Sequence, residues 1–214
     1  MKYVSALSTF ALLFFFGTTF GQNDPKAKKI LDDVTKKVNT LKTIKANFTL
    51  SLTGAKVKDS KSGDIAIKGA KYHVKLTGQE IMCDGKTVWT YNPDAKEVTI
   101  TKFNPQEQGI SPAKLLTNFY DKEYTYKYSK EIKVRGKSCD VIELTPKDAS
   151  KQVKKIELII DKSTTMIAGG KIWSKNGNQT DYSITQVVQN SNIPDNVFAW
   201  DPKSHQGVET NDLR

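Results

Sequence analysis

The side chains that could do acid–base or nucleophilic chemistry are few and scattered. The only histidines are His73, on the polar side of an alternating run, and His205, near the C-terminus. Asp84 precedes Gly85, where a turn explains it without a catalytic role, because no second carboxylate is paired with it. The chain has no Gly-x-Ser-x-Gly, no His-Glu-x-x-His and no phosphate-binding glycine-rich loop. The sequence therefore predicts a protein that is not an enzyme.

The two cysteines leave a question open. Cys83 and Cys139 both lie in strand-like runs, and with two histidines they form no set at zinc-like spacing. We therefore predict no metal and no cofactor. A disulfide suits an exported protein. Two buried thiols fit equally well, because cysteine packs as a small hydrophobe.

The first residues are typical of a secretory signal. An apolar run from Val4 to Phe16 is followed by Thr19-Phe20-Gly21, with small residues at the positions that precede a cleavage site. The alternative is a membrane anchor, but the run is shorter than the roughly 20 residues that a span needs. We predict a signal peptide over 1–21, and a single domain over 22–214 that is exported to the periplasm in soluble form.

The protein is basic, with a net charge of +10 that becomes about +9 without Lys2. The lysines alternate with apolar positions, which is typical of the solvated outer faces of strands. Weak attraction to a membrane or to an acidic partner is the alternative. No run of Lys and Arg has interleaved aromatic residues, so the sequence does not predict nucleic-acid binding.

Residues 81–100 show how the chain is built. Asp84-Gly85 suits a two-residue hairpin turn, and Asn92-Pro93-Asp94-Ala95 suits a second reversal. Between them, Thr87, Trp89 and Tyr91 alternate with Val88 and Thr90, so each set points to one face of a strand. Similar runs recur along the chain and predict about eleven strands. Among them are two separate strands at Tyr124–Tyr128 and Ile132–Val134, and two more at Thr165–Ala168 and Gly170–Ser174. We expect a polar loop over Gly54–Ser62 and a loop-like tail over Ile193–Arg214, in which Phe198 and Trp200 act as isolated anchors.

Two helices are predicted. Asp24 is a good N-cap and Pro25 a good first residue for an amphipathic helix that runs to about residue 40. Ser111-Pro112 opens a second, short helix in the same way. So many strands form a large antiparallel sheet, which must curl as its twist accumulates. We therefore predict a mainly β fold (α+β), an incomplete antiparallel β-barrel with helices that cover its concave apolar face and enclose a pocket.

The run Asp84-Gly85-Lys86-Thr87-Val88-Trp89-Thr90-Tyr91-Asn92-Pro93 resembles the Asp-Gly-Lys-Thr-Leu-Trp-x-Tyr-Asn/Asp-Pro signature of the outer-membrane lipoprotein carrier family, LolA. Three further segments are similar to that family: the strand around Phe48, the run Leu144-Thr145-Pro146-Lys147, and the closing residues Phe198, Pro202, Gly207 and Val208. The resemblance covers residues 24–214 in order.

The resemblance implies an unclosed β-barrel covered by helices, which shuttles acylated lipoproteins from an inner-membrane ABC-type complex to the outer membrane. It implies partners of three kinds: acylated lipoproteins, that release complex, and an outer-membrane receptor lipoprotein in cells that have one. The residues that we expect to contact acyl chains are Phe48, Leu50, Ile65, Ile67, Tyr72, Val74, Trp89 and Tyr91. The expected lid residues are Leu31, Val34, Leu115, Leu116 and Phe119. We expect the protein to act as a monomer.

One segment departs from the family. Where family members commonly carry an arginine that bonds the lid helices, this chain has Lys68-Gly69-Ala70-Lys71-Tyr72. Lys68 is the candidate to bond the lid, although it lacks the planar fork of arginine. The alternative function is a periplasmic binding or sensor module for another amphiphile, such as a glycolipid or fatty-acyl ligand. A closed core without a cavity is the structural alternative for the apolar residues named above.

Overall fold

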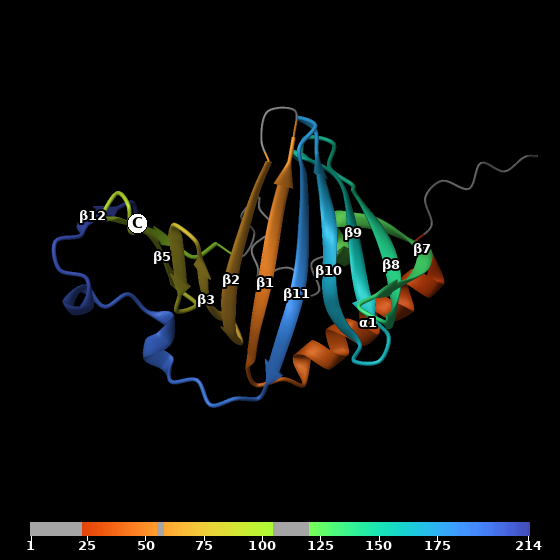
Figure 1. The fold of residues 1–214 in the computed structure, drawn as a ribbon, viewed down its shortest axis with the longest axis horizontal. Coiled ribbons are helices and arrows are strands. Elements are labelled where there is room, and N and C mark those ends of the chain that lie inside the picture. Colours follow the sequence, from red (N-terminus) through yellow and green to blue (C-terminus); the bar gives the residue numbers. More distant parts are fainter. Residues whose placement is uncertain (1–22, 55–57, 105–119) are drawn as a thin grey trace, which may run out of the picture.

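The computed structural model describes residues 23–54, 58–104 and 120–214, which form one curved sheet with a long helix at its side (Figure 1). The signal peptide predicted over 1–21, and the helix predicted from Ser111, lie outside these residues. In the described part of the chain, no helix is long and apolar enough to cross a bilayer.

Twelve strands make up the sheet, in the order β12-β6-β5-β4-β3-β2-β1-β11-β10-β9-β8-β7. Every neighbouring pair is antiparallel except β12 and β6, which are parallel. The strands are β1 (Ile44–Thr53), β2 (Lys58–Lys68), β3 (Lys71–Leu76), β4 (Gln79–Cys83), β5 (Thr87–Asn92), β6 (Glu97–Lys102), β7 (Tyr124–Val134), β8 (Lys137–Pro146), β9 (Val153–Asp161), β10 (Met166–Ser174), β11 (Gln179–Gln189) and β12 (Glu209–Asp212). The helices are α1 (Pro25–Asn39), α3 (Tyr120–Glu123), and the 3-10 helices η1 (Asp195–Phe198) and η2 (Pro202–Ser204). The mainly β, unclosed fold predicted from the sequence is confirmed.

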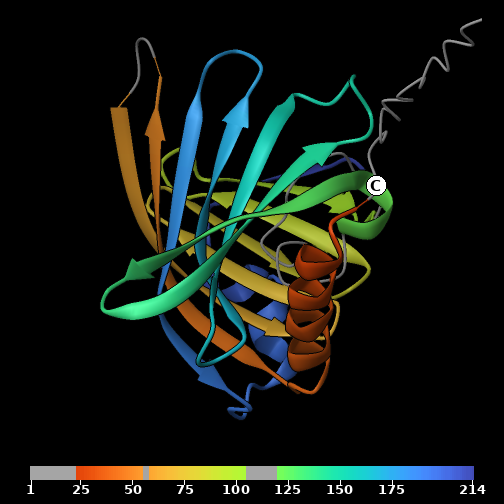
Figure 2. The ribbon, with the colours of Figure 1, turned by 90° about the vertical axis from the view of Figure 1, so that its right-hand side faces the viewer.

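Helix α1 begins where the sequence predicted. The Asp24 carboxylate accepts hydrogen bonds from the backbone N–H groups of Lys26 (2.8 Å) and Ala27 (3.4 Å). It also accepts one from the N–H of Tyr128 in β7, which is the largest of the effects that lower the pKa of Asp24. One residue thus caps the helix and ties its start to the sheet. In Figure 2, α1 (orange-red) stands beside the strands that it covers.

The core lies on the concave face. The buried side chains of α1, including Leu31 and Val34, pack into the same apolar cluster as those of β1, β2, β8 and β9. A second, smaller cluster lies on the convex face, where Ile193 and Phe198 pack with Ala66 of β2. The sheet therefore has apolar contacts on both sides, over different strands.

The strand boundaries differ from expectation in three places. The prediction of a polar loop over Gly54–Ser62 was wrong for residues 58–62. Strand β2 already begins at Lys58, where it pairs with Thr53 at the end of β1. Breaks predicted within β7 and β10 are instead shifts of register, between Tyr128 and Lys130 and between Ile167 and Gly169, which bend a strand without ending it. These changes lengthen the strands that surround the concave face.

The C-terminal tail is the third difference. A loop was expected over Ile193–Arg214, but residues 209–212 form β12, which adds a parallel edge strand beside β6. The backbone N–H of Glu209 donates to the carbonyl of Lys96 (2.8 Å), and that of Leu213 donates to the carbonyl of Ile100 (2.8 Å). The alternation in these four polar residues carries no apolar signal, so the strand was missed.

Candidate functional site

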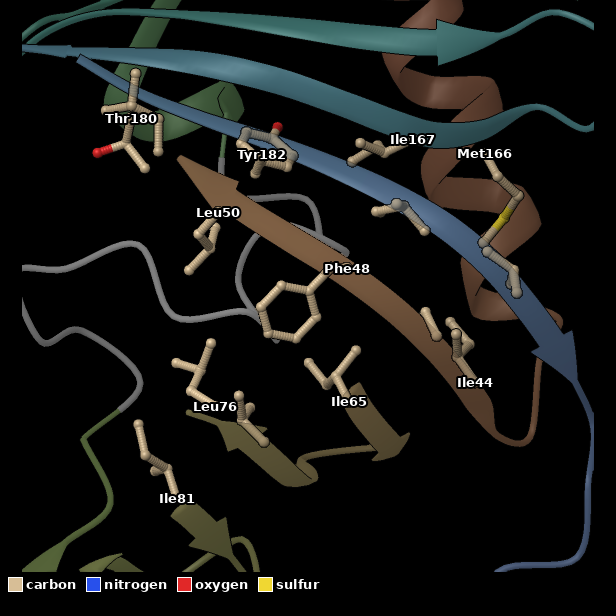
Figure 3. A pocket seen from close by; sticks show the side chains of 15 residues that line it. Ile44, Phe48, Leu50, Ile65, Leu76, Ile81, Met166, Ile167, Thr180 and Tyr182 are labelled. Atoms are coloured by element: carbon tan, nitrogen blue, oxygen red, sulfur yellow. The ribbon is translucent and has the colours of Figure 1, made fainter. Parts of the chain in front are cut away.

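The concave face holds a cavity of about 310 Å³ (Figure 3). Its walls come from six strands, β1 to β4 on one side and β10 and β11 on the other. Apart from Thr180 and Tyr182, every lining residue is apolar. The lining residues are Ile44, Ala46, Phe48, Leu50, Ile65, Val74, Leu76, Ile81, Met166, Ile167, Ile172, Thr180, Tyr182, Ile184 and Val187.

The register of the sheet explains why these side chains meet. In an antiparallel ladder, directly opposed residues share a face. Phe48 is opposite Ile184, and Leu50 is opposite Tyr182, across the β1–β11 pair. Val74 is opposite both Ile65 and Ile81 in the neighbouring strands. One apolar stripe therefore runs across β4, β3, β2, β1 and β11 and forms the floor of the cavity.

Two glycines make room for the rings that shape the cavity. A Cβ atom at Gly63 would lie 2.8 Å from the Phe48 ring and 2.2 Å from the carbonyl oxygen of Lys75. A Cβ atom at Gly170 would lie 2.5 Å from the Tyr182 hydroxyl. Both distances are shorter than van der Waals contact allows, so these aromatic residues take their positions only beside glycine. Among the described residues, none bonds to the buried Tyr182 hydroxyl, whose pKa is raised by burial.

The structure brings together four of the eight residues expected to contact acyl chains. Phe48, Leu50, Ile65 and Val74 all line the cavity. Ile67 and Tyr72 are opposite each other on the same face but lie in the adjoining core rather than in the cavity wall. The ring of Tyr72 makes an edge-to-face contact with Phe103 at 6.4 Å between centroids.

The expected placement of Trp89 and Tyr91 on the apolar concave face was wrong. The register sets Trp89 opposite Met82 and Tyr91 opposite Glu80, on the convex side. Tyr91 packs there against Trp200, with the ring centroids 4.9 Å apart, and against His205 at 5.1 Å. Alternation in β5 divides its residues into two sets but does not say which set faces inward. The smaller residues Val88 and Thr90 face inward, and the C-terminal tail covers Tyr91.

The lid residues have mixed outcomes. Leu31 and Val34 of α1 are buried, with 1% and 5% of their surface exposed, in the core beside the cavity. They are not among the residues that line it. Leu115, Leu116 and Phe119 lie outside the described residues.

Lys68 has its described partners in the C-terminal segment. Its ammonium donates to the carbonyl of Ile193 (3.2 Å) and to the carboxylate of Asp195 (2.7 Å). Lys71 donates to the other oxygen of Asp195 at 2.8 Å. Together the two hydrogen bonds lower the pKa of Asp195 to about 2. Of the hydrogen bonds described for Lys68, none reaches α1, so the expectation that it bonds a lid is not met for that helix.

Sequence reasoning missed the second wall of the cavity. Met166, Ile167 and Ile172 of β10, with Ile184 and Val187 of β11, line it as fully as the strands near Phe48 do. Their alternation in the sequence was a usable signal. What it could not supply was the pairing of β1 with β11, which brings residues about 135 positions apart, such as Phe48 and Ile184, side by side.

The chemistry available in the cavity is burial of apolar groups. Its lining includes no carboxylate, imidazole, thiol or amine. The close pair of His73 and Glu80 (2.5 Å) lies on the convex face instead, where the hydrogen bond from His73 lowers the pKa of Glu80. Within the described residues there is no group of three His, Cys, Asp or Glu side chains that could hold a metal ion. The arrangement suits an elongated apolar ligand.

Comparison with known proteins agrees with this geometry. Residues 39–201 match the family model described as outer membrane lipoprotein carrier protein LolA. An outer-membrane lipoprotein carrier protein of Legionella pneumophila is 28% identical over 172 residues, which cover 78% of this chain and 82% of that protein. One from Xanthomonas oryzae pv. oryzae is 29% identical over 192 residues, covering 86% and 87%.

The solved structures support the fold alone. A crystal structure of an uncharacterized conserved protein from Thermus thermophilus superposes with a TM-score of 0.61 at 12% sequence identity. The superposition covers 87% of this chain and 99% of that chain, so most of this fold has a counterpart of known structure.

Proposed function

Because the chain belongs to the outer-membrane lipoprotein carrier family LolA, we propose that it is a periplasmic carrier, which binds the acyl chains of lipoproteins released from the inner membrane and delivers them to the outer membrane. The observation that carries the proposal is the apolar cavity on the concave face. A carrier of this kind is a binding protein rather than an enzyme.

The cavity is suited to a hydrocarbon chain in size and in composition. Its volume of about 310 Å³ lies at the lower end of the range for small-molecule sites, about 300–1,000 Å³. Each methylene transferred from water to an apolar wall contributes about 0.8 kcal/mol, so several methylenes hold a ligand firmly without any polar contact. Release must then come from a better site elsewhere or from a change in the cavity.

We assign the contacting residues from the structure and the lids from the sequence. Phe48, Leu50, Ile65 and Val74 are proposed to touch the acyl chain, with Ile67 and Tyr72 supporting that wall. Helix α1, through Leu31 and Val34, is proposed to act as one lid. The segment with Leu115, Leu116 and Phe119 is proposed to act as the other.

The remaining assignments rest on the sequence and on the family. We propose that residues 1–21 are a signal peptide and that 22–214 act as a single domain and as a monomer. The proposed partners are acylated lipoproteins, an inner-membrane ABC-type release complex and, where the cell has one, an outer-membrane receptor lipoprotein. Purification from the periplasm, followed by mass spectrometry, tests the cargo. A lipoprotein bound one to one is expected, whereas a bound glycolipid or free lipid would favour a binding module for another amphiphile.

Phe48→Asp tests the cavity directly. The new carboxylate would be buried among apolar side chains, so we expect the affinity for a fluorescent acyl probe to fall at least about tenfold. The matched control is Asn47→Asp, which adds the same charge one residue away on the opposite face of β1. Equal affinity for the probe in the two variants would contradict the assignment. Circular dichroism of both variants distinguishes lost binding from lost folding.

A further inference from the structure

The sheet is split at one end, between β10 and β11. The two strands pair from Gly169 opposite Ser183 to Trp173 opposite Gln179. Beyond that point β11 continues along β1 to Gln189, while residues 166–168 of β10 continue along β9 without a β11 partner. A register shift between Ile167 and Gly169 accompanies the separation. The strands therefore diverge beside the apolar cavity.

A second cavity, of about 280 Å³, lies at this split. It shares four lining residues with the first cavity, namely Met166, Ile167, Ile184 and Val187. In Figure 3, the labelled side chains of Met166 and Ile167 lie beside β11, across the cavity from Leu76 and Ile81. The two cavities are adjacent, so a chain held in the first can extend as far as the second.

Six of the other nine lining residues are polar, namely Arg135, Lys137, Asp161, Thr164, Thr185 and Gln189, and the two cations come from the β7–β8 hairpin. Arg135, at the turn, donates through one guanidinium nitrogen to the carbonyl of Ile184 (2.9 Å) and through the other to the Ser183 hydroxyl. These bonds hold the hairpin tip against β11. In Figure 2 the hairpin (green) extends from the side of α1 across the neighbouring strands.

The charge at this site is unbalanced in favour of an anion. Lys137 pairs with the buried carboxylate of Asp161 at 2.9 Å. Among the described residues, no carboxylate lies within ion-pair distance of Arg135. The lining residues therefore carry two cations against one anion. Three of the five guanidinium N–H donors of Arg135 remain for a ligand after the two bonds to β11.

We propose that this second cavity, here called the Arg135 site, binds the anionic head group of an acyl lipid whose chain lies in the apolar cavity. The ligand class is a single-chain amphiphile with a carboxylate or phosphate, such as a free fatty acid or a lysophospholipid. Arginine suits both groups, because its planar fork matches their oxygens. The proposal rests on the proposed function, since the chain must enter the same cavity, and it adds a charged ligand beyond lipoproteins.

The test compares a charged and an uncharged ligand with the same chain. The probes are a dodecanoic acid labelled at its tail with a nitrobenzoxadiazole fluorophore, and its methyl ester. We expect the wild-type protein to bind the acid more tightly, and Arg135→Gln to lose about tenfold in affinity for the acid while its affinity for the ester changes less than about twofold. Arg135→Lys keeps the charge and is expected to retain part of the preference.

Arg214→Gln is the control, because it removes the same charge at the C-terminus, far along the chain from the split. A lysophospholipid serves as an unlabelled competitor. Displacement of each probe from the wild type would place a phosphate at the same site, and loss of that displacement in Arg135→Gln supports the proposal. If Arg135→Gln loses affinity for the acid and the ester equally, Arg135 acts only by holding the hairpin, and the proposal is overturned. An Arg135→Gln variant that keeps its full affinity for the acid would overturn it as well. If the wild type binds neither probe, the acyl-binding function itself fails.

Discussion

Asp161 is a buried carboxylate with a full set of partners. Only 5% of its surface is exposed. It accepts hydrogen bonds from the N–H (2.8 Å) and hydroxyl (2.6 Å) of Ser163 and from the ammonium of Lys137 (2.9 Å). Burial by itself raises the pKa of this carboxyl group, but the bonds from Ser163 and Lys137 outweigh it and lower the pKa to about 2. The ionised form is therefore the one that the fold stabilises.

The lowered pKa of Asp161 predicts how the free energy of unfolding depends on pH. Since the folded pKa lies below the unfolded value of 3.8, the contribution of Asp161 is present above pH 3.8 and is lost as the pH falls through about 2. We expect a contribution of about 2 kcal/mol to the free energy of unfolding. Asp161→Asn should be less stable than the wild type at pH 7, and the difference should shrink toward pH 2. Urea titrations at a series of pH values measure it.

The exposed turn residue Asp94 offers the control, because Asp94→Asn removes a carboxylate that is not buried in the fold. At pH 7 it should lose much less stability than Asp161→Asn does. A loss for Asp161→Asn that is no larger than that of Asp94→Asn, or that does not shrink toward pH 2, would refute the role given to the Ser163 and Lys137 bonds.

The face on which a residue lies was predictable where the alternation of residue types along its own strand decides it. Phe48 and Leu50 were placed correctly, because β1 alternates apolar and polar residues and only one set can be buried. Tyr91 was not, because both faces of β5 carry side chains that can pack, and the choice depends on the tail that covers Tyr91 from the far end of the chain. Alternation along a strand carries no information about such distant partners.

The C-terminal segment is held to the convex face by a small cluster and by ion pairs. Phe198 is fully buried and Ile193 nearly so, and both pack with Ala66 of β2. Lys68 and Lys71 reach the Asp195 carboxylate from the same side of the sheet. The apolar contacts should dominate, since exposed ion pairs contribute little.

Phe198→Ala tests this element. Removal of a fully buried ring should lower the free energy of unfolding by about 3–5 kcal/mol, which a urea titration measures. Acyl-probe affinity of the folded variant should be unchanged, because the segment lies on the face opposite the cavity. The comparison variant is Asp195→Asn, for which a much smaller loss is expected. A larger loss for Asp195→Asn than for Phe198→Ala would mean that the ion pairs hold the segment.

A helix or strand was predictable when the sequence signals for it lie within the element or next to it. Helix α1 was placed to within a residue, because its cap, its proline and its apolar spacing all lie inside the helix or next to it. Strand β12 was not predicted, since its four residues are all exposed and it exists only through its pairing with β6. A short edge strand of this kind has no apolar period to detect.

Across the whole molecule, the two cysteines lie far apart in the order of the strands. Cys83 is in β4 and Cys139 is in β8, with β3, β2, β1, β11, β10 and β9 between them. Both are free and buried. Burial is the largest of the effects that raise the pKa of each thiol, which leaves little of the reactive thiolate near neutral pH. The question that the sequence left open is settled by the strand order, which no local pattern contains.

We predict two thiols per chain that react only on unfolding. A chromogenic thiol reagent should label neither thiol in the native protein and both in denaturant, because the thiols are buried and largely protonated. A reducing agent should leave the melting temperature unchanged. A drop in melting temperature on reduction would instead reveal a disulfide.

The order of the strands has two free ends. In the described part of the chain no strand joins β7 to β12, so the sheet does not return on itself. In a closed barrel, strand number and stagger fix the diameter. Here no ladder of hydrogen bonds fixes the width of the concave face, so a change of curvature can widen or narrow it while every strand keeps its neighbours. A sheet that can adjust in this way can accommodate ligands of different size, which suits a carrier that must bind its cargo and then release it.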